Sequence, residues 1–505
     1  MLFVQADRQV QFHTSLGEDV LYLDKLFGRE EVSRLYRFDV GLYSEDREIV
    51  FDDIVGRPVG VSVARPGAGP RFLHGFVNSF EHVLDLEDFA YYRATVVPWL
   101  WFLTRTSNCR IFQGMTAPDI VRDVIRAHGF TDFEFHLTEE YPALEYCTQY
   151  RETDFNFVSR LLEEFGLHYV FRHEAERHVL LIADSLSAHS TVNGLEEIRF
   201  DPDTRHNRTD NTIWEWTVGR RVQPFRYEIR DFDCSAPNAP VVSTGAGEPR
   251  MHEHSGYEIY DYAGLRMKPD HSNLIATRRI EELESKYERT HGRMGTAGLG
   301  IGSLFDLTEA PRGDQNREYF VTGGEHEIRT NRFRSGGEDG SEEETYEYRF
   351  SCQAADHPFR PARITPRPVI QGPQTAIVTG PDGEEIHVDD RARVKVRFHW
   401  DRSDTPNQDA SIWIRVAQMW AGNIWGALFM PRIGHEVVVE FLEGDPDRPL
   451  ITGSVYNESQ QPPFLRSLEK KPQNKTVSTI LTSTSKGGEG YNGIAFQDKE
   501  GEEGL

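Results

Sequence analysis

The stretch from Ala392 to Asn457 constrains the fold of this chain more than any other part of it. Apolar and polar residues alternate in short runs, and Gly, Pro and Asp residues interrupt them at close intervals. The clearest runs are 393–401, 413–416 and 431–441, and a turn-rich segment at 443–453 follows them. Such alternation predicts half-buried strands, and short strands with close turns are typical of a small closed β-barrel. The stretch shows no cluster typical of an active site, so we expect a mechanical or connective role for it.

The composition is that of an acidic globular protein. The chain has 505 residues, enough for three or more domains, and a formal net charge of −25. That charge repels a phosphate backbone, and no local basic patch offsets it, so we expect no nucleic-acid partner. No basic segment followed by an apolar core opens the chain, and no apolar run approaches the ~20 residues that span a bilayer. We therefore expect the chain to fold in the cytoplasm without a signal peptide and without stable membrane insertion.

Residues 1–357 read as mainly β with a few helices, an α+β region. We expect strands over 59–63, 71–77, 91–99, 167–171, 319–330 and 345–352, and helices over 116–129, 154–165 and 273–289. The polar segment 335–341 suits the exposed tip of a hairpin, and 236–249, rich in Pro, Gly and small residues, suits a linker or long loop.

Prolines divide the rest of the chain. A Pro-rich linker is expected over 358–373, the small barrel over 374–457 and a second linker over 458–474. The last segment, 475–505, favours strands but is too small to bury a core alone, and its strand edges would lack partners. Strands from other copies of the chain could supply those partners, which predicts an oligomer with interleaved strands. A frayed tail is the alternative.

Residues with catalytic or metal-binding potential do not form a convincing set, so we predict no catalytic, cofactor or metal residue. The thiols are isolated, the Gly-rich loop 298–302 lies after a helix and before a strand, and the His-Glu pair at 435 lacks the second His of a zinc motif. Carboxylates are plentiful, but none stands out as a glycosidase pair. The residues considered were Cys109, Cys147, Cys234, Cys352, His168, His173, His178, His252, His254, His435, Glu436 and Val439.

Aromatic residues in the predicted barrel raise one rival function, because OB-type barrels stack nucleic-acid bases on such side chains. The aromatics are Phe398, Trp400, Trp413, Trp420, Trp425 and Phe429. Arg393, Lys395 and Arg397 alternate along one strand, but acidic residues crowd the strands that follow. The balance of charge disfavours oligonucleotide binding.

Three motifs of this chain carry a resemblance to a known family. They are YRETDFNFVSRLLEEFGLHY at 150–169, the barrel run at 392–457, and SKGGEGYNGIAFQDKEGEE at 485–503. Together they resemble the VgrG spike family of the bacterial type VI secretion system. The first is similar to the hub domain of contractile phage tails, the second to the OB domain of the VgrG family, and the third to the opening of its triple-stranded β-helix needle. Their order covers nearly all of the chain and is highly specific.

The resemblance implies a hub region with β-barrel domains and inserted helices at 1–357, an OB-fold at 374–457 and the start of a trimeric β-helix needle at 475–505. It implies a non-enzymatic homotrimer at the tip of a hexameric Hcp-type tube, capped by a PAAR-type tip protein. The spike would pierce a target membrane and carry effector cargo or adaptors, staying cytoplasmic until the secretion machine fires and delivers it. The needle of the family continues further than Leu505, so we expect a truncated or short needle here.

Two other functions stay open. The chain could be the hub and tail spike of a contractile phage or bacteriocin-like particle, which works by the same mechanics. A peptidoglycan-hydrolase spike of the phage type is disfavoured, because no stretch between 357 and 505 is long enough for an inserted lysozyme domain.

Overall fold

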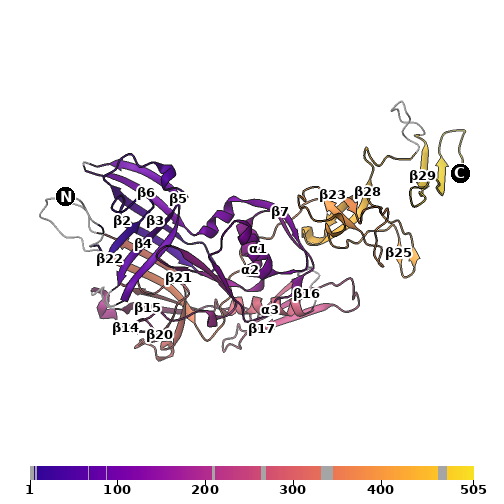
Figure 1. The fold of residues 1–505 in the computed structure, drawn as a ribbon. Helices are drawn as coiled ribbons and strands as arrows, with labels where there is room; N and C mark the ends of the chain where they lie inside the picture. The colour runs from indigo at the N-terminus through magenta and orange to yellow at the C-terminus, as the bar shows by residue number, and fades with distance from the viewer. Residues whose placement is uncertain are drawn as a thin grey trace. The chain divides into compact units, whose positions relative to one another are not determined.

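The computed structural model describes Gln5 and residues 8–65, 68–86, 88–206, 211–262, 269–330, 345–463 and 475–505 (Figure 1). The chain is mainly β and forms two compact units. The large unit comprises Met1–Ser107, Thr116–Pro142 and Thr153–Pro366. The small unit comprises Asn108–Met115, Ala143–Glu152 and Arg367–Leu505. The small unit therefore takes two short segments from the first third of the chain.

Twelve strands of the large unit form one sheet, whose first half is an antiparallel array in the order β1-β4-β5-β6-β3-β2. Its strands are β1 (Val10–His13), β2 (Tyr22–Glu31), β3 (Arg37–Ser44), β4 (Pro58–Arg65), β5 (Ala68–Asp85) and β6 (Ala90–Val97). Burial alternates along β2, as expected of a strand with one face on the core. The predicted strands 59–63 and 71–77 lie inside β4 and β5, and 91–99 runs along β6 into the helical turn that begins at Trp99.

The second half of that sheet closes on itself. The order β21-β20-β14-β15-β19-β22 returns to its start because β22 also pairs with β21, so these strands form a barrel. They are β14 (Glu197–Phe200), β15 (Thr212–Arg220), β19 (Glu288–Met294), β20 (Leu304–Thr308), β21 (Glu318–Arg329) and β22 (Thr345–Ala354). Phe305, Tyr319, Tyr348 and Phe350 belong to its buried core. The predicted strands 319–330 and 345–352 are confirmed, while the polar tip 335–341 lies outside the described residues.

Glycine lets the large rings enter this barrel core. A Cβ on Gly292 would lie 2.4 Å from the Phe350 ring, and one on Gly324 would lie 2.3 Å from the hydroxyl of Tyr348. Both distances are far shorter than a carbon contact allows, so a side chain at either position would displace an aromatic ring of the core.

The helices are α1 (Ala117–Ala127), α2 (Asp154–Phe165) and α3 (Pro269–Glu284). The side chains of Thr116 and Thr153 cap α1 and α2 by accepting hydrogen bonds from backbone amides, and Gly166 ends α2 at a φ of 71°. The first two helices were predicted at these positions. The prediction for α3, 273–289, was wrong at its end. Residues 288–294 form β19 instead, because pairing with β15 and β22 overrides the local helical pattern.

Two small sheets complete the large unit. One has the order β12-β13-β9, and the other has the order β17-β16-β18 with α3 packed against it. Their strands are β9 (Phe133–His136), β12 (His168–His173), β13 (His178–Ala183), β16 (Arg226–Asp231), β17 (Val241–Ala246) and β18 (Glu258–Tyr262). Strand β17 corrects the expectation that 236–249 is a linker or loop. Gly245 in this strand lies directly against the carbonyl of Ala276, so the small residues allow close packing on α3.

The small unit contains the closed barrel that the sequence predicts. Strands β23 (Gln374–Thr379), β24 (Lys395–Phe398), β27 (Glu436–Phe441) and β28 (Pro449–Val455) pair in the order β24-β23-β27-β28. Bridges from Ile414 to Val394 and from Val416 to Ile451 join the two ends of this sheet. The core is β-branched and aromatic, and it includes Val378, Val394, Val396, Phe398, Ile414, Val437, Val439 and Ile451.

The segments taken from the first third of the chain include most of β7 (Ser107–Phe112) and β11 (Cys147–Thr153), which pair with each other. Tyr146, just before β11, is buried in the barrel core. Two hairpins are also part of the small unit, one formed by β25 (Ala421–Gly422) and β26 (Trp425–Gly426), the other by β29 (Val477–Leu481) and β30 (Gly493–Gln497). Among the described residues, no helix is both long enough and apolar enough to cross a bilayer.

Candidate assembly surfaces and buried polar groups

A buried network of histidines surrounds Glu30 in the large unit. Glu30 lies on β2, is 5% exposed, and accepts hydrogen bonds at 3.0 Å from His173 Nε2 and 2.7 Å from His326 Nε2. Arg71 adds an ion pair at 3.4 Å. Burial acts to raise the pKa of Glu30, but the bonds from the two histidines outweigh it and hold that pKa well below its usual range. The carboxylate is therefore charged and fully partnered inside the unit.

The network continues through two more histidines. His74 Nδ1 lies 3.0 Å from His178 Nδ1, and His178 Nε2 accepts the backbone N–H of Trp99 at 3.0 Å. Burial lowers the pKa of His74 to about 4 and that of His178 to about 2, so both rings are neutral at pH 7. The sequence indicated no catalytic or metal role for the histidines at 168, 173 and 178. The structure places His173 and His178 opposite each other on β12 and β13, and His168 Nε2 lies 2.8 Å from His189 Nε2.

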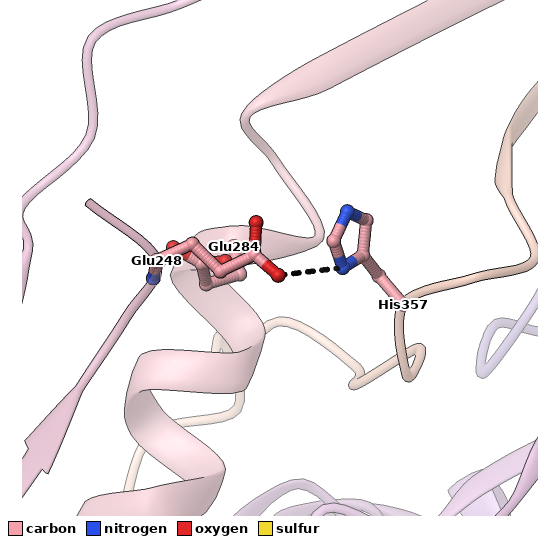
Figure 2. A group of neighbouring side chains, drawn as sticks. All are labelled: Glu248, Glu284 and His357. Atoms are coloured by element: carbon pink, nitrogen blue, oxygen red, sulfur yellow. Dashed lines mark hydrogen bonds and ion pairs between the residues drawn. The ribbon is translucent and has the colours of Figure 1, made fainter. Parts of the chain in front are cut away.

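A group of polar side chains, Glu248, Glu284 and His357, lines a cavity of about 600 Å³ in the large unit (Figure 2). His357 Nδ1 lies 3.9 Å from Glu248 Oε1. Arg250 neutralises Glu284 at 3.0 Å and stacks over the Tyr287 ring at 3.8 Å. The three groups lie close enough to share a cation, but each is partly exposed and Arg250 already supplies a positive charge.

Of the His-x-His pair, His252 lines the same cavity, and both its ring nitrogens lack a hydrogen-bond partner among the described residues. His254 lies 3.0 Å from the hydroxyl of Tyr257. The remaining motifs are structural. Residues 298–302 form a turn into β20, as predicted, but they follow strand β19 and not the expected helix. The four cysteines are free thiols. His435 Nδ1 accepts the backbone N–H of Arg432 at 3.3 Å, at the start of β27.

Half of the barrel aromatics are part of the barrel itself. Phe398 is buried, Trp400 stacks on it at 5.0 Å, and Trp413 lies beneath the ammonium of Lys395 at 5.3 Å. The basic side chains of this strand also have acidic partners: Arg393 pairs with Asp389, Lys395 with Asp409 and Arg397 with Asp401. This geometry gives the oligonucleotide interpretation no support.

The other aromatics lie on a projecting hairpin that we name the apolar arm, residues 417–431, which carries β25 and β26 (Figure 1). Its large apolar side chains are exposed: Met419, Trp420, Ile424, Trp425, Leu428, Phe429 and Met430. Sequence reasoning grouped Trp420, Trp425 and Phe429 with the barrel. The absence of any charge between Arg415 and Arg432 was the available sign that they form a separate surface.

A second exposed surface lies on the C-terminal hairpin. Strands β29 and β30 pair with each other, so each finds one partner within its own chain, contrary to the expectation that both edges depend on other copies. Among the described residues, no further strand pairs with the outer edges of this two-stranded sheet, and one bridge from Gln497 to Gly504 covers the end of β30. Ile480, Ile494 and Phe496 are each about half exposed, so the hairpin buries no core of its own, as the sequence predicts.

A closed barrel with inserted helices, followed by a small OB-type barrel, defines the hub and injector class of contractile tails. Residues 29–332 match the phage tail baseplate hub (GPD) family, and residues 374–456 match the type VI secretion system/phage-baseplate injector OB domain.

The chain belongs to the VgrG family of type VI secretion system spike proteins. It is 43% identical to spike protein VgrG1a of Pseudomonas aeruginosa, with 99% of this chain and 77% of that protein covered. It is 42% identical to VgrG1c of the same bacterium, with 100% and 69% covered. In structure it is similar to the E. coli c3393 protein, a type VI secretion component that itself resembles the T4 bacteriophage tail proteins gp27 and gp5. That match has a TM-score of 0.63 and 24% identity, covers 88% of this chain and 100% of the other, and shows the fold alone.

Proposed function

We propose that the protein is a non-enzymatic puncturing spike, a homotrimer at the tip of a type VI inner tube. The observation that carries this proposal is the C-terminal hairpin: apart from the Gln497–Gly504 bridge, no described strand pairs with its outer edges, and its apolar side chains are half exposed. Three copies that wind these strands together would pair the edges and bury Ile480, Ile494 and Phe496. The barrel at 374–457 would then form the neck, and 475–505 would begin the needle.

The same proposal assigns partners by position. The region 1–357 would bind a hexameric Hcp-type tube protein. The linker 358–373 would join hub and neck, and the linker 458–474, of which 464–474 lie outside the described residues, would join neck and needle. A PAAR-type tip protein would cap the needle, and effectors or adaptors would travel with the spike. The protein would stay cytoplasmic until the machine fires and drives it through a target membrane without stable insertion.

Light scattering after size-exclusion chromatography tests the trimer. At micromolar concentration and physiological salt, we expect a mass of about 174 kDa, three times the 58.0 kDa of one chain. A folded monomer under those conditions would contradict the proposal. A peptidoglycan-clearing assay tests the non-enzymatic role, and clearing by the purified protein would contradict that part.

A further inference from the structure

We propose that the apolar arm is a trimerisation element, and that the small unit of a second copy of this chain covers it in the assembled spike. This inference deepens the proposed homotrimer by naming a surface that holds it together. It concerns residues 417–431, apart from the C-terminal strands that carry the proposed function.

The arm exposes more apolar surface than a free protein face normally carries. Met419 is 78% exposed, Trp420 is 65% exposed and Ile424 is 99% exposed, and four more large apolar side chains lie within the next six residues. Scattered single apolar residues need no partner, but a contiguous group of this kind marks a contact surface. Trp and Met are also enriched at the centres of protein interfaces.

Internal hydrogen bonds and a ring contact hold the arm in one conformation. Gln418 clamps its base, because its side-chain amide donates to the Phe429 carbonyl at 3.1 Å and its oxygen accepts the Phe429 N–H at 2.8 Å. The backbone N–H of Ala427 donates to the Trp420 carbonyl at 2.8 Å, and the rings of Trp420 and Trp425 meet edge to face at 5.1 Å. An ordered arm loses little conformational entropy on binding, which favours its use as an anchor.

Ile424 at the turn of the arm supplies independent support. Its φ is 65°, in the left-handed region where a β-branched residue is strained and Gly or Asn is favoured. The side chain gains no burial within its own chain in return, since it is almost fully exposed. A strained apolar residue at this position is explained if another molecule contacts it.

The charge pattern of the chain fits a second copy as that molecule. Each copy carries a net charge of −25, so copies repel one another, and their contact is most favourable where the surface has no charge. Residues 416–431 form the longest run in the chain without Asp, Glu, Lys or Arg, 16 residues in all.

Symmetry points to the same occupant. Every copy carries an arm, and a cyclic trimer covers all three arms in equivalent contacts, whereas a single cargo or tip protein would leave arms uncovered. Exposed apolar side chains of the small unit outside the C-terminal hairpin that could receive the arm of a neighbour include Val369 and Val455.

Substitutions at the arm tip test the inference in the full chain. Ile424→Gly removes the apolar side chain and relieves the left-handed strain, so the monomer should fold at least as well as the wild type. Ile424→Asp combined with Met419→Asp places two carboxylates on each arm. Met251→Asp, at a fully exposed apolar residue of the large unit, is the matched control.

We expect the double Asp variant to raise the concentration at which the trimer dissociates by at least about tenfold. Ile424→Gly should raise it less. The circular dichroism spectra of both variants should match that of the wild type. Met251→Asp should leave it unchanged. The inference is overturned if both arm variants dissociate at the wild-type concentration. It is also overturned if they stay trimeric but lose binding to a tip or cargo protein or to anionic lipid vesicles, because the arm would then serve that partner. A wild-type monomer would instead refute the proposed trimer itself.

Discussion

Glu163 shows how a single buried carboxylate holds part of the large unit together. It lies on α2, and its side chain accepts hydrogen bonds from the backbone N–H groups of Ile364 at 2.9 Å and Thr365 at 2.8 Å. The Thr365 hydroxyl donates to it at 2.9 Å, and Arg34 pairs with it at 3.1 Å. The first half of the expected linker 358–373 is thus held against α2. The group that holds it is the Glu163 carboxylate, which belongs to the motif at 150–169.

Replacing this carboxylate by an amide is expected to destabilise the large unit. Glu163→Gln turns one accepting oxygen into a donor that faces backbone donors and removes the charge that Arg34 neutralises. We expect a loss of roughly 2–4 kcal/mol in the free energy of unfolding, measured by urea denaturation. Glu134→Gln, which removes an exposed ion pair with Arg172, should cost less than about 1 kcal/mol. Equal effects of the two changes would contradict the role of Glu163.

The histidine network around Glu30 predicts that acid weakens the large unit. The folded pKa of His74 is lowered to about 4, so below pH 6.5 the unfolded chain binds a proton that the folded chain does not. Stability from His74 is therefore full above about pH 6.5 and falls as the pH falls, by about 2 kcal/mol at pH 5. His178 acts in the same direction. The lowered pKa of Glu30 adds stability that is present above its unfolded pKa and is lost at still lower pH.

Urea unfolding at pH 7.5, 6 and 5 measures this dependence. The expected result is a steady fall in the free energy of unfolding from pH 6.5 downward, with proton uptake on unfolding. His74→Gln should reduce that uptake by nearly one proton at pH 5, since the amide does not titrate. Stability that is constant or rises toward pH 5 would contradict the inferred neutral state of these rings.

At the scale of elements, the barrel of the small unit depends on strands from far away in the chain. Tyr146 enters its core just before β11, and the backbone N–H of Thr148 donates to Asp447 at 2.6 Å. The Tyr150 ring lies 5.8 Å from Trp400, and its hydroxyl accepts a hydrogen bond from Gln374 at 2.8 Å. Residues 143–152 are therefore part of the barrel's packing.

Truncating Tyr146 should loosen the barrel although this residue lies more than two hundred positions before it. Tyr146→Ala leaves a cavity in a closed core, and we expect a loss of roughly 3–5 kcal/mol in the stability of the small unit. Tyr456→Ala, at an exposed tyrosine of the same unit, should change it by less than about 0.5 kcal/mol. Thermal unfolding followed by tryptophan fluorescence compares the two variants. Indistinguishable melting curves would show that 143–152 does not stabilise the barrel.

Some of these elements could be predicted from local signals in the sequence, and others could not. Strands β4, β5, β21 and β27 and helices α1 and α2 follow from alternation, caps and glycines, which are local signals. The end of α3 and the strand β17 do not, because both are decided by pairing with residues distant in sequence. The closure of the large barrel through β21 and β22 and the placement of 143–152 are hidden for the same reason.

Of the two surfaces proposed for assembly, one could be predicted from the sequence and the other could not. The strand-forming tail at 475–505 could be predicted from the sequence, because a segment this small cannot bury a core or supply partners for all of its strand edges. The apolar arm could be recognised only from the structure. Phe398 and Trp425 are both aromatic, but Phe398 is buried and Trp425 is exposed. The buried network of Glu30, His173 and His326 joins three strands whose contact no local pattern encodes.

At the scale of the whole molecule, net charge and apolar contact oppose each other. Three copies carry a combined formal charge of −75, three times −25, so the assembled spike is under strong self-repulsion. The surfaces proposed to join the copies, the arm and the C-terminal hairpin, hold the copies together by apolar burial and strand pairing rather than by opposite charges. Salt screens the repulsion and leaves those contacts nearly untouched.

We therefore expect the trimer to become tighter as salt is added. Between about 0.01 M and 0.1 M NaCl the screening length falls from about 30 Å to about 10 Å, so repulsion between copies is largely removed. The concentration at which the trimer dissociates should fall several-fold over this range, as followed by analytical ultracentrifugation. Ile424→Asn changes no charge and suits the left-handed turn, so it should shift this curve to higher concentration without changing its slope. A trimer that dissociates more readily as salt rises would mean that ion pairs, not the arm and the hairpin, hold the copies together.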